Sequence, residues 1–507
     1  MFELEKISKS FNELTALADV NLKIAKEHTT VFIGPSGCGK STLIRVLMGF
    51  TLIAALALGA AFYIAENASG PTVEIIQPSR LVGRSAIFEA LVTAPGGNLT
   101  SLDAIIEQDG RILALYSLDT PLEGEVRQNG PDSVRITRRF DQSSHPELAA
   151  GTARVVVSAA RPVLFGLREA SATADLEIEV RIDPPRIQVV SDFHYINHGG
   201  SEMVAYRVMP PDAESGVRVG DRRYRGYPAS GAGVDGDDTL QVAFFALLHD
   251  QDLGTPIELY AEDTAGNSSR VPFDHRVFPK PFRRSRIPLS DEFLRVVIPP
   301  IVERAPELAD EELDPATSIE ELADLYLFIN RTLRQRNRET LAAFSGGTSV
   351  HLQWDGPFVP LPNSQVESGF ADHRTYVFAG NEIDQQVHLG FDLASTANTP
   401  VSAANNGTVI HADYLGIYGN CVIIDHGMGL QSLYAHLSVI DVAPGEQVSR
   451  AQRIGLSGRT GLAGGDHLHF AMLLQGHPVT PVEWWDPHWI EDRVERKLRE
   501  ASTQAVL

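Results

Sequence analysis

The chain has 507 residues, of which 43% are hydrophobic and 21% are charged, a balance typical of folded domains. This length allows roughly three or four domains of ordinary size. A formal net charge of −22 argues against a general nucleic-acid-binding protein, which shows a basic footprint, and against attachment to anionic lipid by charge alone. The two cysteines, Cys38 and Cys421, lie on opposite sides of an apolar stretch, so no disulfide framework is expected.

The first 45 residues end in a phosphate-binding motif. The stretch "GPSGCGKS", residues 34–41, fits GxxxxGK[ST] in full and follows an apolar strand, "TTVFIG". Together with "LADVNLKI" it resembles the beginning of an ABC-transporter ATPase domain. Hydrolysis also needs an acidic metal-holding residue on a later strand, and neither that residue nor the family's "LSGGQ" signature follows. We therefore interpret residues 1–45 as a truncated segment fused to another protein near residues 45–50, and expect no ATP binding. Whether the fusion arose in the genome or in sequence assembly stays open.

An apolar stretch follows at once. Residues 46–65 are 20 residues without a charge, the length that crosses a hydrocarbon core of about 30 Å. Lys40 and Arg45 precede the stretch and Glu66 follows it, so the positive-inside rule places the N-terminus in the cytoplasm and the rest outside. This predicts a single-pass anchor in the cell (inner) membrane. The small residues of "AENASG" leave cleavage as a signal peptide open, and a buried core helix is the other alternative.

Short alternating strands dominate the next two hundred residues. Segments such as "TVEIIQP", "AIFEALVTAP" and "ARVVVSAA" are separated by turn signals over residues 71–183, which favours an Ig-like β-sandwich. A second such module is expected over 184–278. Residues 279–345 are interpreted as a proline-bearing linker followed by a helix over about 319–343, which begins at a Ser318–Glu321 capping box. The predicted fold class is therefore mainly β, with one transmembrane helix, two β-sandwich modules, a connecting helix and a β-rich domain over 346–490, followed by a tail over 491–507.

The chemistry lies in the C-terminal domain, in three short motifs. "HLGFD" contains His388 and Asp392, "LYAHLS" contains His436, and "DHLHF" contains His467 and His469. Catalytic zinc takes about three protein ligands and keeps one position open. In a strand, residues i and i+2 share a face, so His467 and His469 should point into one site while Leu468 and Phe470 pack behind them.

Taken together, these motifs resemble lysostaphin-type (LytM-type) zinc metallopeptidases, which cleave peptide bonds in bacterial peptidoglycan. The resemblance covers about residues 350–487. It implies that His388, Asp392 and His469 bind Zn²⁺ and that His436 and His467 are the catalytic histidines. One departure is "SGFADHRTY", in which Ala371 stands where the family has glycine.

Zinc lowers the pKa of a bound water to about 7, and either catalytic histidine could take the proton or stabilise the oxyanion. Tyr434 would share the face of His436 and either assist or simply pack. Trp484 and Trp485 either line a substrate groove or belong to the core. His426 is interpreted as structural, and His351, His373 and His411 lack partners at ligand spacing.

The predicted function is a membrane-anchored zinc metalloendopeptidase that hydrolyses peptide bonds in peptidoglycan cross-links or stems, with its catalytic domain in the periplasm or outside the cell. Its expected partners are peptidoglycan peptides and the membrane, with no nucleic acid. A non-catalytic wall-binding or hydrolase-activating protein is the alternative, and an ABC-transporter ATP-binding component is a remote one. All three expected metal ligands and both histidines are present, which favours the enzyme.

Overall fold

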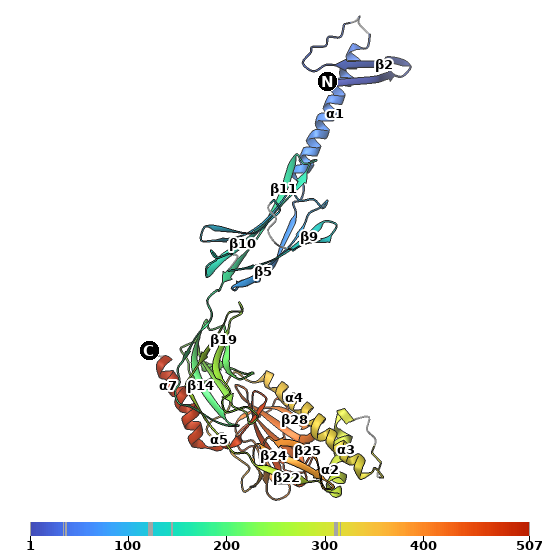
Figure 1. Ribbon diagram of the computed structural model, residues 1–507. Coiled ribbons are helices and arrows are strands. Elements are labelled where there is room, and N and C mark those ends of the chain that lie inside the picture. The colour runs from blue at the N-terminus through green and yellow to red at the C-terminus, as the bar shows by residue number, and fades with distance from the viewer. Residues whose placement is uncertain are drawn as a thin grey trace. The chain divides into compact units, whose positions relative to one another are not determined.

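The computed structural model forms two compact units, Met1–Ile182 and Asp183–Leu507. It describes residues 2–33, 35, 38–119, 125–142, 145–308, 313–314 and 316–505. Strands predominate in both units (Figure 1), which confirms the mainly β class.

The N-terminal unit begins with a hairpin and a long helix. Strands β1 (Phe2–Phe11) and β2 (Leu14–Ile24) pair antiparallel, and helix α1 runs over Lys40–Glu66. Helix α1 has a mean hydropathy of 2.1 and only 6% of its apolar window is buried, so its length and composition suit a membrane span or a signal sequence. Three residues of the phosphate-binding motif, Gly34, Ser36 and Gly37, lie outside the described residues.

Two sheets follow α1 and pack face to face. One has the order β3-β5-β9-β8, with bounds Thr72–Gln77, Ser85–Thr93, Ser133–Asp141 and Glu125–Gly130. The other has the order β4-β11-β10-β6-β7, with bounds Leu81–Val82, Arg168–Val180, Gly151–Val163, Ser101–Gln108 and Arg111–Ser117. Alternate residues such as Phe88, Ile106 and Val155 are fully buried in one shared core. The alternation in sequence therefore corresponds to a sandwich with one buried face on each sheet.

The C-terminal unit begins with another pair of four-stranded sheets. One has the order β12-β14-β18-β17, with bounds Arg186–Val189, Ser201–Met209, Leu240–Ala246 and Tyr227–Pro228. The other has the order β16-β15-β19-β20, with bounds Arg222–Arg225, Glu214–Val219, Ile257–Glu262 and Ser268–Pro272. A short parallel pair, β13 (His194–Asn197) and β21 (His275–Phe278), lies beside them. Their core continues into the C-terminal domain, where Phe244 contacts Trp484 of the helix Pro481–Trp485 at a ring-centroid distance of 5.8 Å.

Three helices connect these sheets to the C-terminal domain. Helix α3 (Ile319–Phe328) begins at the Ser318–Glu321 capping box, as predicted, and continues through one π turn (Ile329–Leu333) into α4 (Arg334–Phe344). Helix α2 (Asp291–Arg304) was not predicted, because its two internal prolines suggested a linker. The Ser290 side chain caps α2, and its apolar face packs on α3.

The C-terminal domain is organised around an eight-stranded sheet. Its order is β23-β26-β34-β30-β29-β28-β32, with β35 paired to β34. The bounds in that order are Gln365–Ser368, Phe391–Ala394, Leu468–Leu474, Leu430–Leu437, Asn420–Gly427, Gly407–Tyr414 and Gln447–Val448, with β35 at His477–Val479. Two three-stranded sheets accompany it: β22-β24-β25 (Arg284–Pro288, Asp372–Phe378, Asn381–His388) and β27-β33-β31 (Pro400–Ser402, Arg453–Leu456, Val439–Ile440).

The end of the chain is helical and returns to the first sheets of this unit. Helices α5 (Pro481–Trp485), α6 (Pro487–Ile490) and α7 (Arg496–Ala505) follow the last strand, with a π turn over Glu491–Glu495. Lys497 is fully buried and donates to the carboxylate of Glu202 at 2.8 Å. The sequence pattern predicts only a tail over residues 491–507, whereas residues 491–505 are helical. A buried ion pair that loses one partner is costly, so this helix is tied to β14.

A second buried carboxylate, Glu483 of α5, predicts a pH dependence of stability. It accepts hydrogen bonds from Nδ2 of Asn197 and the backbone N–H of Ser201, both at 2.7 Å, while burial raises its pKa from 4.5 to about 7. The folded state then holds this proton more tightly than the unfolded state. Unfolding free energy should therefore fall as pH rises from about 4.5 to 7, by on the order of 3 kcal/mol.

Urea denaturation of the wild type and of Glu483→Gln at pH 5 and pH 8 measures this contribution, because glutamine resembles the protonated acid and does not titrate. The variant should lose less stability between the two pH values than the wild type. Equal losses in both proteins would contradict the assignment.

Candidate active site

Three side chains from three strands converge on one point of the C-terminal domain. His388 ends β25, Asp392 lies in β26 and His469 lies in β34, and the last two are direct partners across the antiparallel pair. Nε2 of His388 lies 2.9 Å from Oδ1 of Asp392 and 3.0 Å from Nδ1 of His469, and that Nδ1 lies 3.0 Å from the same Oδ1. All three side chains are buried, and their potential ligand atoms lie within 4.8 Å of one another.

The contacts behind His388 determine which of its nitrogens faces this point. Nδ1 lies 3.1 Å from the carbonyl oxygen of Gly369, which can only accept, so Nδ1 carries the proton. Nε2 then directs a lone pair at the carboxylate oxygen of Asp392. Two acceptor atoms at this distance repel unless a cation or a proton lies between them. Two imidazole nitrogens and a carboxylate oxygen are a ligand set that zinc takes, so the residues present fit a zinc ion.

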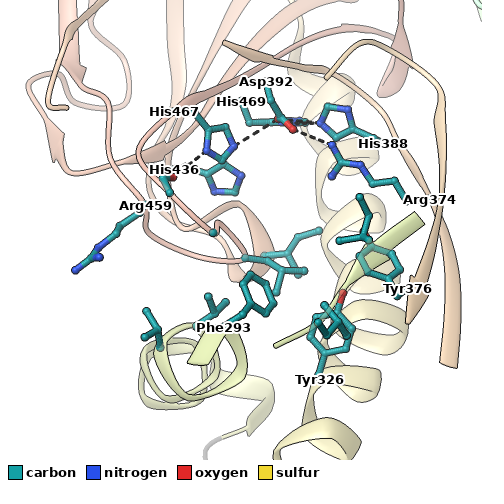
Figure 2. Close-up of a pocket in the computed structure, with 18 of the residues that line it drawn as sticks. Phe293, Tyr326, Arg374, Tyr376, His388, Asp392, His436, Arg459, His467 and His469 are labelled. Atoms are coloured by element: carbon teal, nitrogen blue, oxygen red, sulfur yellow. Dashed lines mark hydrogen bonds and ion pairs between the residues drawn. The ribbon is translucent and has the colours of Figure 1, made fainter. Parts of the chain in front are cut away.

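Two further histidines face the same point from the other side (Figure 2). Nδ1 of His436 lies 2.8 Å from the carbonyl of Thr460, and Nδ1 of His467 lies 2.9 Å from the carbonyl of Gly465. Both rings therefore direct Nε2 away from these carbonyls, and Nε2 of His467 lies 3.5 Å from Oδ1 of Asp392. The ring centroids of His436 and His467 are 4.9 Å apart. The structure thus brings together all five residues that the sequence singled out.

Burial and neighbouring charge shift the pKa values of these histidines in different directions. Burial, followed by the nearby His467 and His469, lowers the pKa of His436 well below its ordinary value. Burial also lowers the pKa of His469, to about 4. Burial lowers the pKa of His467 too, but its hydrogen bond with Asp392 and the charge of that carboxylate outweigh burial and raise it. The two outer histidines are therefore electrostatically unlike, although their backbone anchors are alike.

Arg374 in β24 was missed by the sequence analysis. Its Nη2 donates to Oδ2 of Asp392 at 2.9 Å, so the two carboxylate oxygens have different partners. Arg374 lies in "SGFADHRTY", fourteen positions before His388. No rule of sequence spacing connects Arg374 with Asp392. Only the antiparallel pairing of β24 with β25, in which Asp372 faces His388, places it there.

Replacement of Arg374 by alanine should weaken zinc binding by about 10–100-fold, the usual effect of removing a group that orients a metal ligand. Competition with a zinc chelator measures the affinity. Arg459→Ala is the matched control, because Arg459 lines the same cavity and points away from Asp392 (Figure 2). Equal zinc affinity in the Arg374→Ala variant and the wild type would contradict an orienting role.

Ala371 adopts a backbone conformation that favours glycine. Its φ is +59° and its side chain is fully buried, and its N–H donates to the carbonyl of His388 at 2.7 Å. Alanine therefore occupies a left-handed position here, where the family tends to have glycine. A left-handed conformation costs an L-residue about 1–2 kcal/mol, which exceeds the entropic penalty of glycine of about 0.5–1 kcal/mol.

We therefore expect Ala371→Gly to raise the free energy of unfolding by about 0.5–1 kcal/mol, as measured by urea denaturation. Ala371→Val should lower it, because a β-branched residue tolerates this conformation least. A less stable glycine variant would show that the methyl group's packing outweighs the backbone strain.

The structure also separates the remaining candidates from the site. The hydroxyl of Tyr434 accepts from the N–H of Ala404 at 2.7 Å and contacts Ser432, so Tyr434 belongs to the buried core. His436 itself has a φ of +65°, which breaks the alternation that placed both side chains on one face. Trp484 is fully buried in the core, and Trp485 packs on Phe391 and Phe470.

The other histidines likewise have local explanations. His426 is fully buried, with its two ring nitrogens 2.7 Å from the Asn406 carbonyl and from Oγ of Ser432. His351 and His373 are exposed, and His411 contacts the backbone of Asp413. None of these four histidines lines the cavity that contains His388, Asp392 and His469.

The five residues lie at one end of a cavity of about 830 Å³. Helix α2 contributes Phe293 to the opposite wall, where Tyr326 and Tyr376 also lie (Figure 2). Arg334 and Arg459 add positive charge, and Glu367 and Asp466 add negative charge.

Comparison with known proteins confirms both resemblances in the sequence. Residues 386–481 match the model of peptidase family M23, and residues 17–55 match the model of the ABC transporter family. The chain therefore carries a peptidase family M23 domain that contains His388, Asp392, His436, His467 and His469. The ABC transporter match ends within α1.

Individual relatives are similar over the same region. The chain is 43% identical over 96 residues to peptidoglycan DD-endopeptidase ShyA of Vibrio cholerae, which is 19% of this chain and 22% of that protein. It is 41% identical over 97 residues to the DD-carboxypeptidase/endopeptidase Mpg of Neisseria meningitidis, again 19% and 22% of the two chains. The match therefore spans less than a quarter of either relative. A solved structure of a putative M23 peptidase from Pseudomonas aeruginosa is 23% identical, covering 56% of this chain and 92% of its own, with a TM-score of 0.32.

Proposed function

We propose that the chain is a membrane-anchored, zinc-dependent endopeptidase that hydrolyses peptide bonds in peptidoglycan cross-links or stems. The observation that carries the proposal is the convergence of His388, Asp392 and His469, with two further histidines beside them in one cavity. The M23 match and the peptidoglycan-cleaving relatives support the substrate class. Helix α1 would remain as the anchor, with the peptidase domain on the outer side of the membrane.

In this proposal His388, Asp392 and His469 hold the zinc ion through Nε2, Oδ1 and Nδ1. When bound, zinc supplies Lewis acidity that makes a water molecule a usable nucleophile near neutral pH. One of the Nε2 atoms of His436 and His467 would take up the proton that the water loses. An Nε2 that carries a proton would donate to the oxygen that becomes negative as the peptide carbonyl is attacked. The carbonyls of Thr460 and Gly465 fix both rings in the tautomer that leaves Nε2 available.

The two carboxylate oxygens of Asp392 contact different groups. Oδ1 faces the two histidine ligands, while Oδ2 accepts from Arg374, so the carboxylate is held from both sides. The Arg374 guanidinium also keeps the carboxyl group ionised, because a cation next to a carboxylate favours its charged form.

Incubation of the purified full-length protein with isolated peptidoglycan tests the proposal. Release of soluble peptides that carry new amino groups, abolished by a chelator and restored by zinc, is the expected result. Zinc-loaded protein that binds the wall without releasing peptides would overturn it and favour the non-catalytic wall-binding alternative.

A further inference from the structure

The tip of one β-hairpin in the N-terminal unit is apolar and uncovered. Strands β10 and β11 pair along their whole length, from Gly151 with Val180 to Val163 with Arg168, and the four residues between them are Leu-Phe-Gly-Leu. Phe165 is 103% exposed and Leu167 is 79% exposed. With Val163 this makes the stretch "VLFGL", which we call the hairpin tip (163–167). Val163 itself is buried and Leu164 is half-buried, so Phe165 and Leu167 are the exposed apolar side chains of the tip. Exposed apolar side chains at a turn mark a contact surface, because turns are ordinarily polar.

The hairpin lies against the C-terminal end of α1. The guanidinium of Arg168 stacks over the ring of Phe62 in α1, 4.8 Å from its centroid. Nε of Arg161 donates to the carbonyl of Ser69, just after the helix, at 2.9 Å. A Cβ on Gly70 would meet the backbone of Ser171 at 2.7 Å, so the chain leaving α1 runs directly along β11.

These contacts show which way the β10–β11 hairpin runs along α1. Gly70 lies beside Ser171, and Phe62 lies beside Arg168, so the path along β11 towards the tip runs along α1 into its apolar stretch. Phe62 precedes Glu66, the first charged residue after that stretch, by four residues, or about 6 Å of helix. The tip lies beyond Arg168 on this path, and therefore at the depth of Phe62 or deeper. In Figure 1 one end of the β10–β11 hairpin lies beside the end of α1.

We propose that the hairpin tip inserts into the outer leaflet of the bilayer that α1 crosses. This inference rests on the proposal that α1 is a retained membrane anchor. Lipid is the partner that would cover the apolar tip. The tip lies alongside α1, and the apolar stretch of α1 is itself almost entirely exposed, as expected for a helix that contacts lipid. Arg161 in β10 and Arg168 in β11 lie next to the tip in the hairpin. With the tip in the bilayer, their side chains would reach the lipid headgroups. The membrane then holds the sandwich at two points, which restricts rotation about the short connection after α1.

Nitroxide labelling of the full-length protein in vesicles of phosphatidylcholine and phosphatidylglycerol tests the inference. Cys38 is exposed and is first changed to serine. Cys421 is fully buried, and burial raises the pKa of its thiol, so it stays unlabelled. The test label is placed by Phe165→Cys. The control is Ile112→Cys, which is exposed in β7 beside the opposite end of the hairpin, and Leu58→Cys reports on α1.

We expect the label at position 165 to be more accessible to oxygen, which concentrates in lipid, than to a water-soluble nickel chelate, and the label at 112 to show the reverse. If position 58 is in lipid but position 165 behaves like position 112, the inference is wrong while the anchor stands. If position 58 is also in water, the anchor proposal fails and the inference fails with it. Protection of position 165 in native membranes but not in vesicles would overturn the inference in favour of a membrane-protein partner.

Discussion

Asp392→Asn is expected to abolish zinc retention and peptidoglycan hydrolysis together. The amide replaces a negatively charged oxygen that faces His388 and His469 at 2.9 and 3.0 Å, and it also loses the charge that pairs with Arg374. Removal of a group that only orients a ligand costs about 10–100-fold in metal affinity, so the loss of a ligand should exceed about 100-fold. Metal analysis of the purified protein and chelator competition measure it.

His373→Ala is the matched control for this loss. His373 is an exposed histidine of the same domain outside the cavity, and its variant should retain zinc and activity. An Asp392→Asn protein that still holds one zinc per chain at wild-type affinity would place the metal elsewhere and contradict the proposed ligand set.

His436→Ala and His467→Ala should each lower kcat by about 10²–10⁴-fold, the range for general acid–base groups, while zinc stays bound. The double variant should be little worse than the poorer single variant, because groups that act as one unit are not additive. A synthetic cross-linked muropeptide gives kcat and KM, and metal analysis of the same samples gives the zinc content.

The zinc content decides between two roles for His467. Its Nε2 lies 3.5 Å from Oδ1 of Asp392, close enough to raise the question of a fourth ligand. Loss of zinc in His467→Ala would make it a ligand and would contradict the division between holding and proton-transferring histidines.

The sequence could predict that these five residues converge, because they lie in short motifs on or next to strands. The two-residue spacing of His467 and His469 places both in the cavity, with Leu468 and Phe470 buried behind them, as period-two alternation requires. The same rule failed for Tyr434 and His436, because the left-handed backbone at His436 reverses the alternation. Sequence periodicity carries no sign of such a local conformation.

The parts that escaped prediction depend on contacts between distant segments. Arg374 reaches Asp392 only through strand pairing. Helix α2 contains Pro299 and Pro300, which normally end helices, and its apolar face is stabilised by packing on α3. The final helix is held by Lys497 with Glu202, a pair separated by 295 residues. Local propensity cannot report such tertiary stabilisation.

Hydrolysis of a defined cross-linked muropeptide dimer in ¹⁸O-labelled water, followed by mass spectrometry, tests the central claim most directly. A zinc-dependent peptidase that uses water as its nucleophile should yield two peptides, with one ¹⁸O in the newly formed carboxyl group and none elsewhere. Intact dimer after incubation with the zinc-loaded protein, or cleavage in the sugar chain with the peptide bonds unbroken, would contradict it.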